Sequence, residues 1–247
     1  MILAFDIGNG SIKLARFADG RREGGLRLPL DADLAPYAAE EVVAAVSVNP
    51  AALARAKAAL PRLRVVGQGV PYPLPVLYDP PGSLGADRVM GVVGALHQLP
   101  DAPAVAVLDV GTCLTVTVGL RGQGVLGGAI LPGAALMGRA LRRGTAALPD
   151  VAVVFPDRAV GRSTEESIRS GIGFGLVGAA RELLRRTLEE CPAGTRVVAA
   201  GTGADALAGH LSGIDAVHPF ATLWGVYVAV TSASRRQGGL RSGPEAG

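Results

Sequence analysis

The chain has 247 residues, of which 49% are hydrophobic and 18% charged, so it can bury enough apolar surface to fold as a globular protein. This composition excludes a disordered tail and a disulfide-stapled miniprotein. The 24 basic and 21 acidic residues leave a net charge of +3 that is spread along the chain, so we expect no nucleic acid partner.

Cysteine usage and hydropathy indicate the compartment. Cys113 and Cys191 form no CxxC pair and no metal-spaced cluster, which is typical of a reducing environment. The chain reaches Asp6 before an apolar signal-peptide core could form, and it contains no run of 18 uncharged apolar residues. We therefore expect a cytoplasmic protein without a membrane segment.

In the first hundred residues the pattern predicts alternating strands and helices. Residues 40–50 read as a strand that ends at a proline, and residues 51–60 have helical composition. Five prolines make residues 67–83 an extended loop, because proline fixes φ and biases the preceding residue away from helix. A short strand at 63–66 and a helix at 84–99 complete this part.

The second part of the chain repeats this alternation. Residues 163–190 hold a long amphipathic helix, with Ser163 or Thr164 as its cap. The other predicted elements are a strand at 127–133, a helix at 134–148, a strand at 196–200 and a final helix at 222–235.

Two stretches of the sequence resemble one another. Residues 1–17 and 104–120 align with Asp6 on Asp109, and each has an apolar strand, an Asp-apolar-Gly turn and an alternating strand. A repeat of this kind predicts two similar α/β halves.

The repeat also predicts the domain limits. We expect an N-terminal half at residues 1–102 and a C-terminal half at 103–236, with Pro100 and Pro103 marking the seam. Residues 237–247 have the composition of a disordered tail.

Both turns suit the binding of phosphate. Gly8 and Gly111 let backbone N–H groups approach phosphate oxygens, while Asn9, Ser11 and Thr112 can donate further hydrogen bonds. Hairpin turns also use Asp and Gly for geometric reasons alone, but two matching copies favour phosphate binding.

Three features near these turns leave alternatives open. Asp6 and Asp109 would hold a cation rather than touch phosphate, because a bare carboxylate repels it. Lys13 can reach back to a phosphate, or it is an exposed strand lysine. Gly201–Gly203 follows a strand and suits either a nucleobase platform or a plain turn.

Several short motifs occur in order along the chain: Asp6-Ile7-Gly8-Asn9 with Lys13, Ser47-Val48-Asn49-Pro50, Tyr78 with Gly85-Ala86-Asp87-Arg88, Asp109-Val110-Gly111-Thr112, Gly127-Gly128-Ala129-Ile130 with Pro132-Gly133, Leu148-Pro149, Gly161 with Thr164, and Leu223-Trp224-Gly225. By these motifs the sequence resembles the type III pantothenate kinases of the actin-like ATPase superfamily. This resemblance implies an α/β fold of two ribonuclease-H-like (actin-like ATPase) halves with a central cleft.

The resemblance implies ATP-dependent phosphorylation of pantothenate to 4'-phosphopantothenate, the first step of coenzyme A biosynthesis. It implies Mg²⁺, held through the phosphates near Asp6, and a monovalent cation, K⁺ or NH₄⁺, at Asp109. The nucleotide-binding residues that it implies are Asp6, Gly8, Asn9, Gly10, Ser11, Lys13, Gly111 and Thr112.

The same resemblance implies the substrate site. The residues are Tyr78, Gly85, Ala86, Asp87, Arg88 and Thr164. Asp87 would accept the proton of the hydroxyl that is phosphorylated, although its place before a helical pattern also suits a helix cap. Arg88 would bind the carboxylate of pantothenate, or it lies on the surface.

The family is typically homodimeric, with the substrate site completed across the interface. We therefore expect Thr164 and the helix after it to lie near a two-fold interface. The apolar residues proposed for this interface are Ile168, Ile172 and Leu176, with Gly171, Gly173 and Gly175 permitting close backbone approach, although packing within the chain would explain the glycines too.

Two positions depart from the family pattern. Gly10 stands where members usually have Thr, and Thr117 stands where they often have Asp. The first change removes a hydroxyl donor near phosphate, and the second removes an acidic group from the cation region.

Two other functions remain as alternatives. The turns alone would also suit a kinase for another small alcohol, since they bind phosphate and do not choose the acceptor. A regulatory, transcription-accessory relative without essential turnover would share the fold. Asp87, Lys13 and Asp109 together favour an enzyme.

Overall fold

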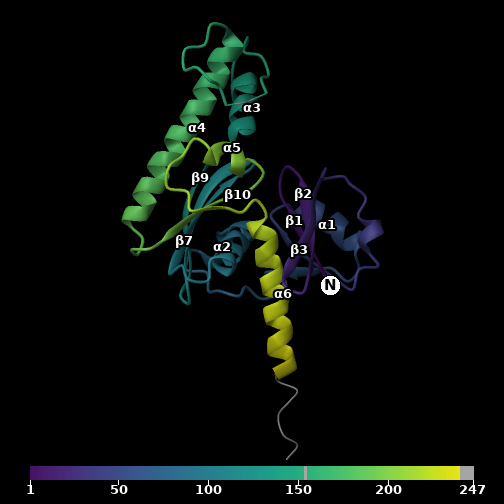
Figure 1. The fold of residues 1–247 in the computed structure, drawn as a ribbon. Coiled ribbons are helices and arrows are strands. Elements are labelled where there is room, and N and C mark those ends of the chain that lie inside the picture. The colour runs from purple at the N-terminus through teal and green to yellow at the C-terminus, as the bar shows by residue number, and fades with distance from the viewer. Residues whose placement is uncertain (153–154, 240–247) are drawn as a thin grey trace, which may run out of the picture. The chain divides into compact units, whose positions relative to one another are not determined.

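The computed structural model describes residues 1–152 and 155–239. The chain divides into two compact units (Figure 1). The first comprises Met1–Pro100, Gly122–Val125 and the C-terminal segment from Phe220, and the second comprises Asp101–Arg121 and Leu126–Pro219. Among the helices of the described residues, none combines the length and apolar character needed to cross a membrane.

The first unit contains a six-stranded sheet with the order β3-β2-β1-β4-β5-β6. Its strands are β1 (Ile2–Ile7), β2 (Ile12–Ala18), β3 (Arg21–Leu28), β4 (Val42–Ser47), β5 (Arg64–Val66) and β6 (Gly69–Val70). Its helices are α1 (Pro50–Ala59), α2 (Ala86–Gln98) and α6 (Ala221–Gly239), with 3₁₀ turns at Ala35–Tyr37 and Pro81–Ser83.

The second unit contains a five-stranded sheet with the order β11-β10-β7-β8-β9. Its strands are β7 (Ala104–Val110), β8 (Cys113–Leu120), β9 (Gly124–Pro132), β10 (Arg196–Ala200) and β11 (Ala216–Val217). Its helices are α3 (Ala134–Gly144), α4 (Thr164–Glu189) and α5 (Ala204–Ala208), and α3 packs beside α4 (Figure 1).

The two sheets repeat one topology, which confirms the predicted fold class. In each, the first strand pairs antiparallel with the second and parallel with the fourth, and the fourth pairs parallel with the fifth. When the strands are renumbered in chain order within each unit, both sheets contain the order 3-2-1-4-5, read from β3 in the first sheet and from β9 in the second. The Asp-apolar-Gly turns join the first and second strands of each sheet, as the sequence repeat predicts.

Local sequence explains how α1 begins. Asn49 is the N-cap, and its side chain accepts a hydrogen bond from the backbone N–H of Ala52 at 3.0 Å. Pro50 occupies the first turn, where a missing N–H leaves no donor unsatisfied. Ser47 Oγ accepts from Asn49 N at 3.1 Å, so the end of β4 leads into the helix through a fixed turn.

Helices α2 and α6 lie unusually close because glycine stands at their crossing. A Cβ atom at Gly94 of α2 would overlap the backbone carbonyl of Ala221, and one at Gly225 of α6 would overlap that of Met90. Only glycine allows two helix backbones to approach this closely. Gly225 is the last residue of the Leu223-Trp224-Gly225 motif, so packing in the first unit accounts for that glycine.

Several element limits differ from the predictions. β3 was not predicted, because its eight residues are exposed or half-buried and lack apolar alternation. α3 ends at Gly144, four residues before the predicted limit. α6 runs to Gly239 and so includes residues 237–239 of the predicted tail, while residues 240–247 lie outside the described part.

The domain limits stay a prediction, because compactness does not show that either unit folds alone. α6 belongs by its contacts to the first unit, packing on α2 and on β1.

Replacing Gly94 by alanine should destabilise the protein by about 1–3 kcal/mol, since the added methyl group overlaps the Ala221 carbonyl and forces α2 from α6. Urea unfolding measures this change. Gly144→Ala is the control: Gly144 ends α3 with no atom within 4 Å of a Cβ there, so stability should stay within about 0.5 kcal/mol of the parent. Equal stabilities for the two variants would contradict the close crossing.

Candidate functional site

The turn between β1 and β2 brings Asp6 and Lys13 together. The two residues face each other across the antiparallel pair, and Lys13 Nζ lies 3.1 Å from Asp6 Oδ2. Gly8 N donates to Ser11 O at 3.1 Å and closes the turn. Since the Asp6 side chain is only 6% exposed, this ion pair compensates a carboxylate that would otherwise be costly to bury.

Asp87 lies in the first turn of α2, in the same unit. Its Oδ1 accepts a hydrogen bond from the backbone N–H of Arg88 at 2.8 Å. Burial raises the pKa of Asp87, and the negative charge of Asp6 raises it further. The Arg88 N–H bond and the positive charges of Lys13 and Arg88 oppose this rise. Asp87 therefore lies within electrostatic range of the β1–β2 turn.

Arg88 and two tyrosines complete this group. Arg88 is only 9% exposed, and burial lowers its pKa while the charges of Tyr78 and Asp87 raise it. Burial raises the pKa of Tyr72, and the charge of Asp87 raises it as well. Tyr72 was not predicted as a site residue. Its position six residues before Tyr78 in the proline-rich loop was the available signal.

Two glycines leave room for the side chains of Asp87 and Tyr72. A Cβ at Gly85, the N-cap of α2, would lie 2.7 Å from Asp87 Oδ1. A Cβ at Gly67, where φ is +84°, would lie 2.6 Å from the Tyr72 hydroxyl. Both contacts are tighter than real Cβ atoms allow, so glycine at these positions leaves room for the carboxylate and the phenol. Ala86 begins α2 between Gly85 and Asp87.

The matching turn in the second unit surrounds Asp109. Gly111 N donates to Cys113 O at 2.9 Å and closes it, while Thr112 is exposed. Gly201, with φ +84°, packs against Asp109: a Cβ at Gly201 would lie 2.6 Å from Asp109 Oδ1.

A second glycine of the Gly201–Gly203 segment forms a hydrogen bond to the same turn. Gly203 N donates to Val110 O at 2.9 Å. The Gly201–Gly203 segment therefore lies against the second turn, a position that the sequence pattern alone did not specify.

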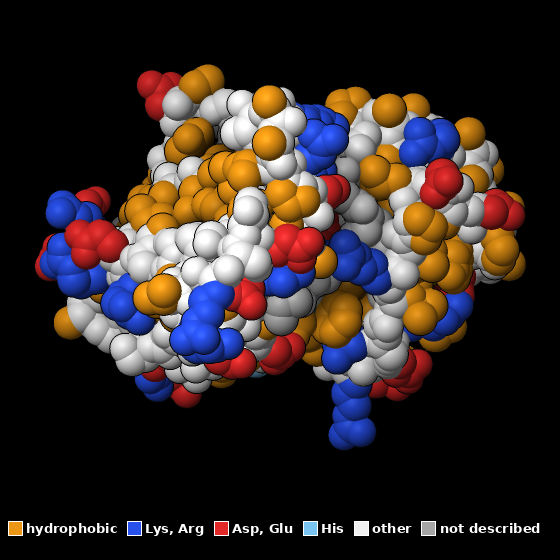
Figure 2. Space-filling view, turned by 90° about the horizontal axis from the view of Figure 1, so that it is seen from above, with side chains coloured by type: hydrophobic (Ala, Val, Ile, Leu, Met, Phe, Trp, Pro, Cys, Tyr) orange, Lys and Arg blue, Asp and Glu red, His pale blue; other side chains and the backbone are white. Residues whose placement is uncertain are grey.

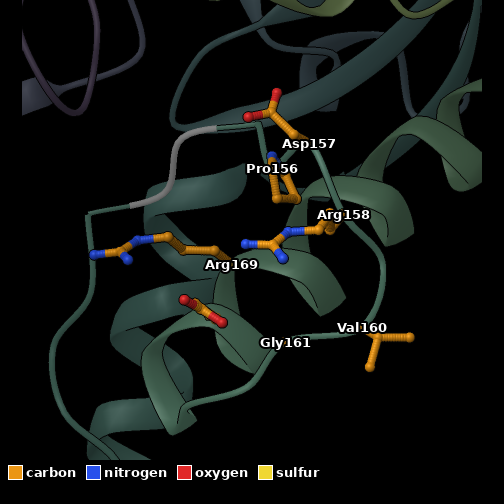
Figure 3. A pocket seen from close by; sticks show the side chains of 7 residues that line it. Pro156, Asp157, Arg158, Val160, Gly161 and Arg169 are labelled. Atoms are coloured by element: carbon orange, nitrogen blue, oxygen red, sulfur yellow. The ribbon is translucent and has the colours of Figure 1, made fainter.

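Thr164 begins α4 and is exposed, with Ser163 as N-cap. Ser163 Oγ accepts from Glu166 N at 3.2 Å, and Glu166 Oε2 accepts from Arg162 N at 2.7 Å. Beside this helix start lies a pocket of about 140 Å³. Figure 3 shows it, and its lining residues are Pro156, Asp157, Arg158, Val160, Gly161, Glu166 and Arg169, so Thr164 is not among them.

The predicted site residues thus fall into two groups. The first unit contains Asp6, Gly8, Asn9, Gly10, Ser11, Lys13, Tyr78, Gly85, Ala86, Asp87 and Arg88. Asp109, Gly111, Thr112 and Thr164 belong to the second. Within the described residues there is no cluster of three or more His, Cys, Asp or Glu side chains that could hold a metal ion by itself.

The charged side chains of the surface are mixed in sign. Figure 2 shows basic and acidic side chains interspersed on one face with hydrophobic ones between them. This face presents no single basic patch of the kind that binds nucleic acid.

A family model described as type III pantothenate kinase matches residues 2–186. The chain belongs to the type III pantothenate kinase family. A type III pantothenate kinase of Legionella pneumophila (strain Corby) is 37% identical over 135 residues, which are 55% of this chain and 52% of that protein. A type III pantothenate kinase of Dehalococcoides mccartyi is 35% identical over 164 residues, which are 66% of this chain and 63% of that protein. The match therefore spans about half to two thirds of the length of these curated relatives.

Solved structures agree on the fold of the family. A candidate Baf family transcriptional activator from Campylobacter jejuni has a TM-score of 0.60 at 16% identity, covering 94% of this chain and 99% of that one. Component A of (R)-2-hydroxyglutaryl-CoA dehydratase from Acidaminococcus fermentans has a TM-score of 0.52 at 13% identity, covering 96% and 98%. At these identities the likeness shows the fold alone, which is that of the actin-like ATPases and sugar kinases.

The two departures from the family pattern lie in different surroundings. Gly10 is exposed in the β1–β2 turn, so the threonine hydroxyl that family members usually carry is absent from the solvent side of that turn. Thr117 is 2% exposed on β8, where it pairs with Val107. A neutral side chain suits that buried position.

Asp87→Asn should leave the protein at least as stable as the parent at pH 7. Because the folded-state pKa of Asp87 is raised, the parent loses stability as pH rises through that pKa, whereas the variant has no carboxyl to ionise. Thermal unfolding between pH 4 and 8 should show the difference between the two proteins growing with pH. A variant clearly less stable than the parent at pH 7 would show that the carboxylate acts mainly as a helix cap.

Proposed function

We propose that this chain phosphorylates pantothenate with ATP to give 4'-phosphopantothenate, the first step of coenzyme A biosynthesis. The observation that carries the proposal is the placement of Asp87, which is half-buried in the first turn of α2 within electrostatic range of Asp6 and Lys13. Membership of the type III pantothenate kinase family supplies the substrate and the reaction.

The β1–β2 turn is proposed to bind the phosphates of ATP. Because the Gly8 N–H closes the turn, the backbone N–H groups of residues 9–11 and the Ser11 hydroxyl are the donors proposed for phosphate, and Gly8 carries no side chain that would block their approach. Lys13, opposite Asp6, places an ammonium group at the same turn. The turn with Gly111 and Thr112 repeats this geometry in the second unit and supports a second set of phosphate contacts.

Asp87 is proposed to orient the hydroxyl of pantothenate and to accept its proton as the bond to phosphorus forms. A carboxylate whose pKa is raised holds a proton more readily than an ordinary one. In a loose transition state for phosphoryl transfer the proton leaves late, so the position of the carboxylate matters more than its basicity. The Arg88 N–H bond and the missing Cβ of Gly85 supply that position.

Arg88 and Tyr78 are proposed to bind the rest of pantothenate, while Thr164 of the second unit stays a predicted substrate residue. The planar guanidinium of Arg88 suits the carboxylate of the substrate, and burial strengthens such a pair by excluding water. Tyr72 lies within electrostatic range of Asp87 and is proposed to adjoin the same substrate site.

We propose that Mg²⁺ and a monovalent cation bind, and the residues present suit both. Mg²⁺ binds through few protein groups and the phosphates of a nucleotide, so Asp6 alone is a sufficient acidic partner. A monovalent cation would lie at Asp109, where glycine at 201 leaves a cradle that a Cβ would fill. When bound, both cations offset phosphate charge.

We also propose a homodimer, formed through α4. Ile168, Ile172 and Leu176 are buried inside the second unit, so packing within that unit accounts for them, and their place near an interface stays a prediction. Gly173 packs on Pro156. The exposed face of α4 instead carries Gly171, Phe174, Gly175 and Gly178, with Phe174 43% exposed and open space at the three glycines.

The alternatives predict different behaviour. A kinase for another alcohol would show higher activity on that alcohol than on pantothenate, and a regulatory relative would show no turnover. The family match favours pantothenate kinase over both. A cytoplasmic location, which the cysteine usage predicts, suits this reaction.

Asp87→Asn should lower turnover of pantothenate at least 100-fold, because it removes the proton acceptor while keeping the shape of the side chain. The fold should survive within about 1 kcal/mol. A coupled ADP-release assay measures the rate. Asp101→Asn, at an exposed position before β7, is the control and should match the parent. Turnover of Asp87→Asn within a few-fold of the parent would show that Asp87 is only a helix cap.

Activity should depend on K⁺ or NH₄⁺ and be low when Na⁺ is the only monovalent cation, because the smaller ion fits a wide oxygen cage poorly. The rate is measured at constant Mg²⁺ and ionic strength. Full activity in sodium alone would remove the proposed role of Asp109.

Phe174→Glu should convert the dimer to a monomer, since it places a charge on the exposed apolar face of α4. Light scattering coupled to gel filtration gives the mass. Val217→Glu, at an exposed apolar position on β11, should remain dimeric. A fully active parent monomer would contradict the proposal.

A further inference from the structure

Arg27 extends the row of charged side chains across the first sheet. The strand pairings place Lys13 opposite Asp6 and Arg27 opposite Lys13, so the three side chains lie on one face of β1, β2 and β3. The adjacent row is Ile7, Ile12 and Leu28, which packs into the core of the unit on the other face. The alternation of the strands therefore sets Arg27 on the face that carries the phosphate turn.

Arg27 contacts the proposed phosphate turn directly. Its Nε–H donates to Ser11 Oγ at 3.0 Å, although the two residues are 16 positions apart in the chain. Across the part of the chain that the structure describes, no ion pair or further hydrogen bond involves the Nη groups of Arg27. By comparison, Arg16 on the neighbouring strand is held by Glu40 at 2.6 Å. Arg27 is thus tied to the turn while its terminal donors remain available.

The charges of the row point to an anionic ligand. The ammonium of Lys13 offsets the buried carboxylate of Asp6 at 3.1 Å, so these two charges largely cancel. Arg27 is the remaining charge of the row, and it is positive. A guanidinium with available Nη donors at a turn of N–H groups suits phosphate oxygens, which it can bind through two parallel hydrogen bonds.

We propose that Arg27 binds the polyphosphate of the nucleotide at the Gly8–Ser11 turn. The proposal deepens the proposed function and rests on it only in taking this turn as the nucleotide site. Gly10 has no hydroxyl to offer, and the Arg27 donors supply contacts in its place. Ser11 accepts from Arg27, which leaves its O–H to donate to a phosphate oxygen.

The test compares binding of ATP and AMP by calorimetry, with Mg²⁺ and without pantothenate. Arg27→Gln should weaken ATP binding about tenfold, the usual scale for loss of one charge-assisted contact, and should change AMP binding less than twofold. Arg27→Lys keeps the charge but loses the planar guanidinium with its two parallel donors, so its ATP affinity should fall between those of the parent and Arg27→Gln.

Arg21→Gln is the matched control. Arg21 is an exposed arginine at the opposite end of β3, paired with Ala18, so the same loss of charge there should leave ATP affinity within twofold of the parent. Circular dichroism confirms that each variant is folded.

The outcomes separate this role from the proposed function. Equal ATP affinity of Arg27→Gln and parent, or equal weakening of ATP and AMP, would overturn the assignment of Arg27 to polyphosphate. Loss of affinity in Arg21→Gln to the same degree would show a general charge effect and overturn it too. A parent that binds ATP but does not phosphorylate pantothenate would contradict the proposed function alone, because the affinity comparison needs no turnover.

Discussion

The close crossing of α2 and α6 is the constraint on which the first unit depends. Gly94 and Gly225 remove the side chains that would separate the helices, and backbone carbonyls occupy the space. α2 carries Asp87 in its first turn, so the depth at which this helix packs sets how far the carboxylate is buried. A C-terminal helix far from Asp87 in sequence therefore helps to place the proposed proton acceptor.

Electrostatics at the start of α2 follow from that placement. Asp87 is half-buried near Asp6, and both its burial and the charge of Asp6 raise its pKa, while the N–H of Arg88 and the charge of Lys13 limit the rise. Lys13 is bound to Asp6, which keeps two carboxylates from standing near one another without a cation. The arrangement balances an acidic pair against one ammonium, and Arg27 adds a positive charge at the proposed phosphate turn.

Much of this fold was predictable because its turns repeat. The Asp-apolar-Gly turns at Asp6 and Asp109 mark the first strand of each sheet, and the strand orders match. The contact of Arg27 with Ser11 was not predictable, since it depends on β3, an exposed strand without apolar alternation. Tyr72 was missed because its position within electrostatic range of Asp87 follows from a loop conformation. In α4, apolar residues alone could not tell the face that packs inside from the face left exposed at Phe174.

The central claim is that the Asp87 carboxylate accepts the proton of the substrate hydroxyl. The most direct measurement is a crystal structure of the protein with pantothenate and a non-hydrolysable ATP analogue. The account predicts an Asp87 oxygen within hydrogen-bonding distance of the pantothenate hydroxyl, about 2.6–3.2 Å, with that hydroxyl facing the terminal phosphate. A hydroxyl held by another side chain, with Asp87 bonded only to the N–H of Arg88, would contradict it.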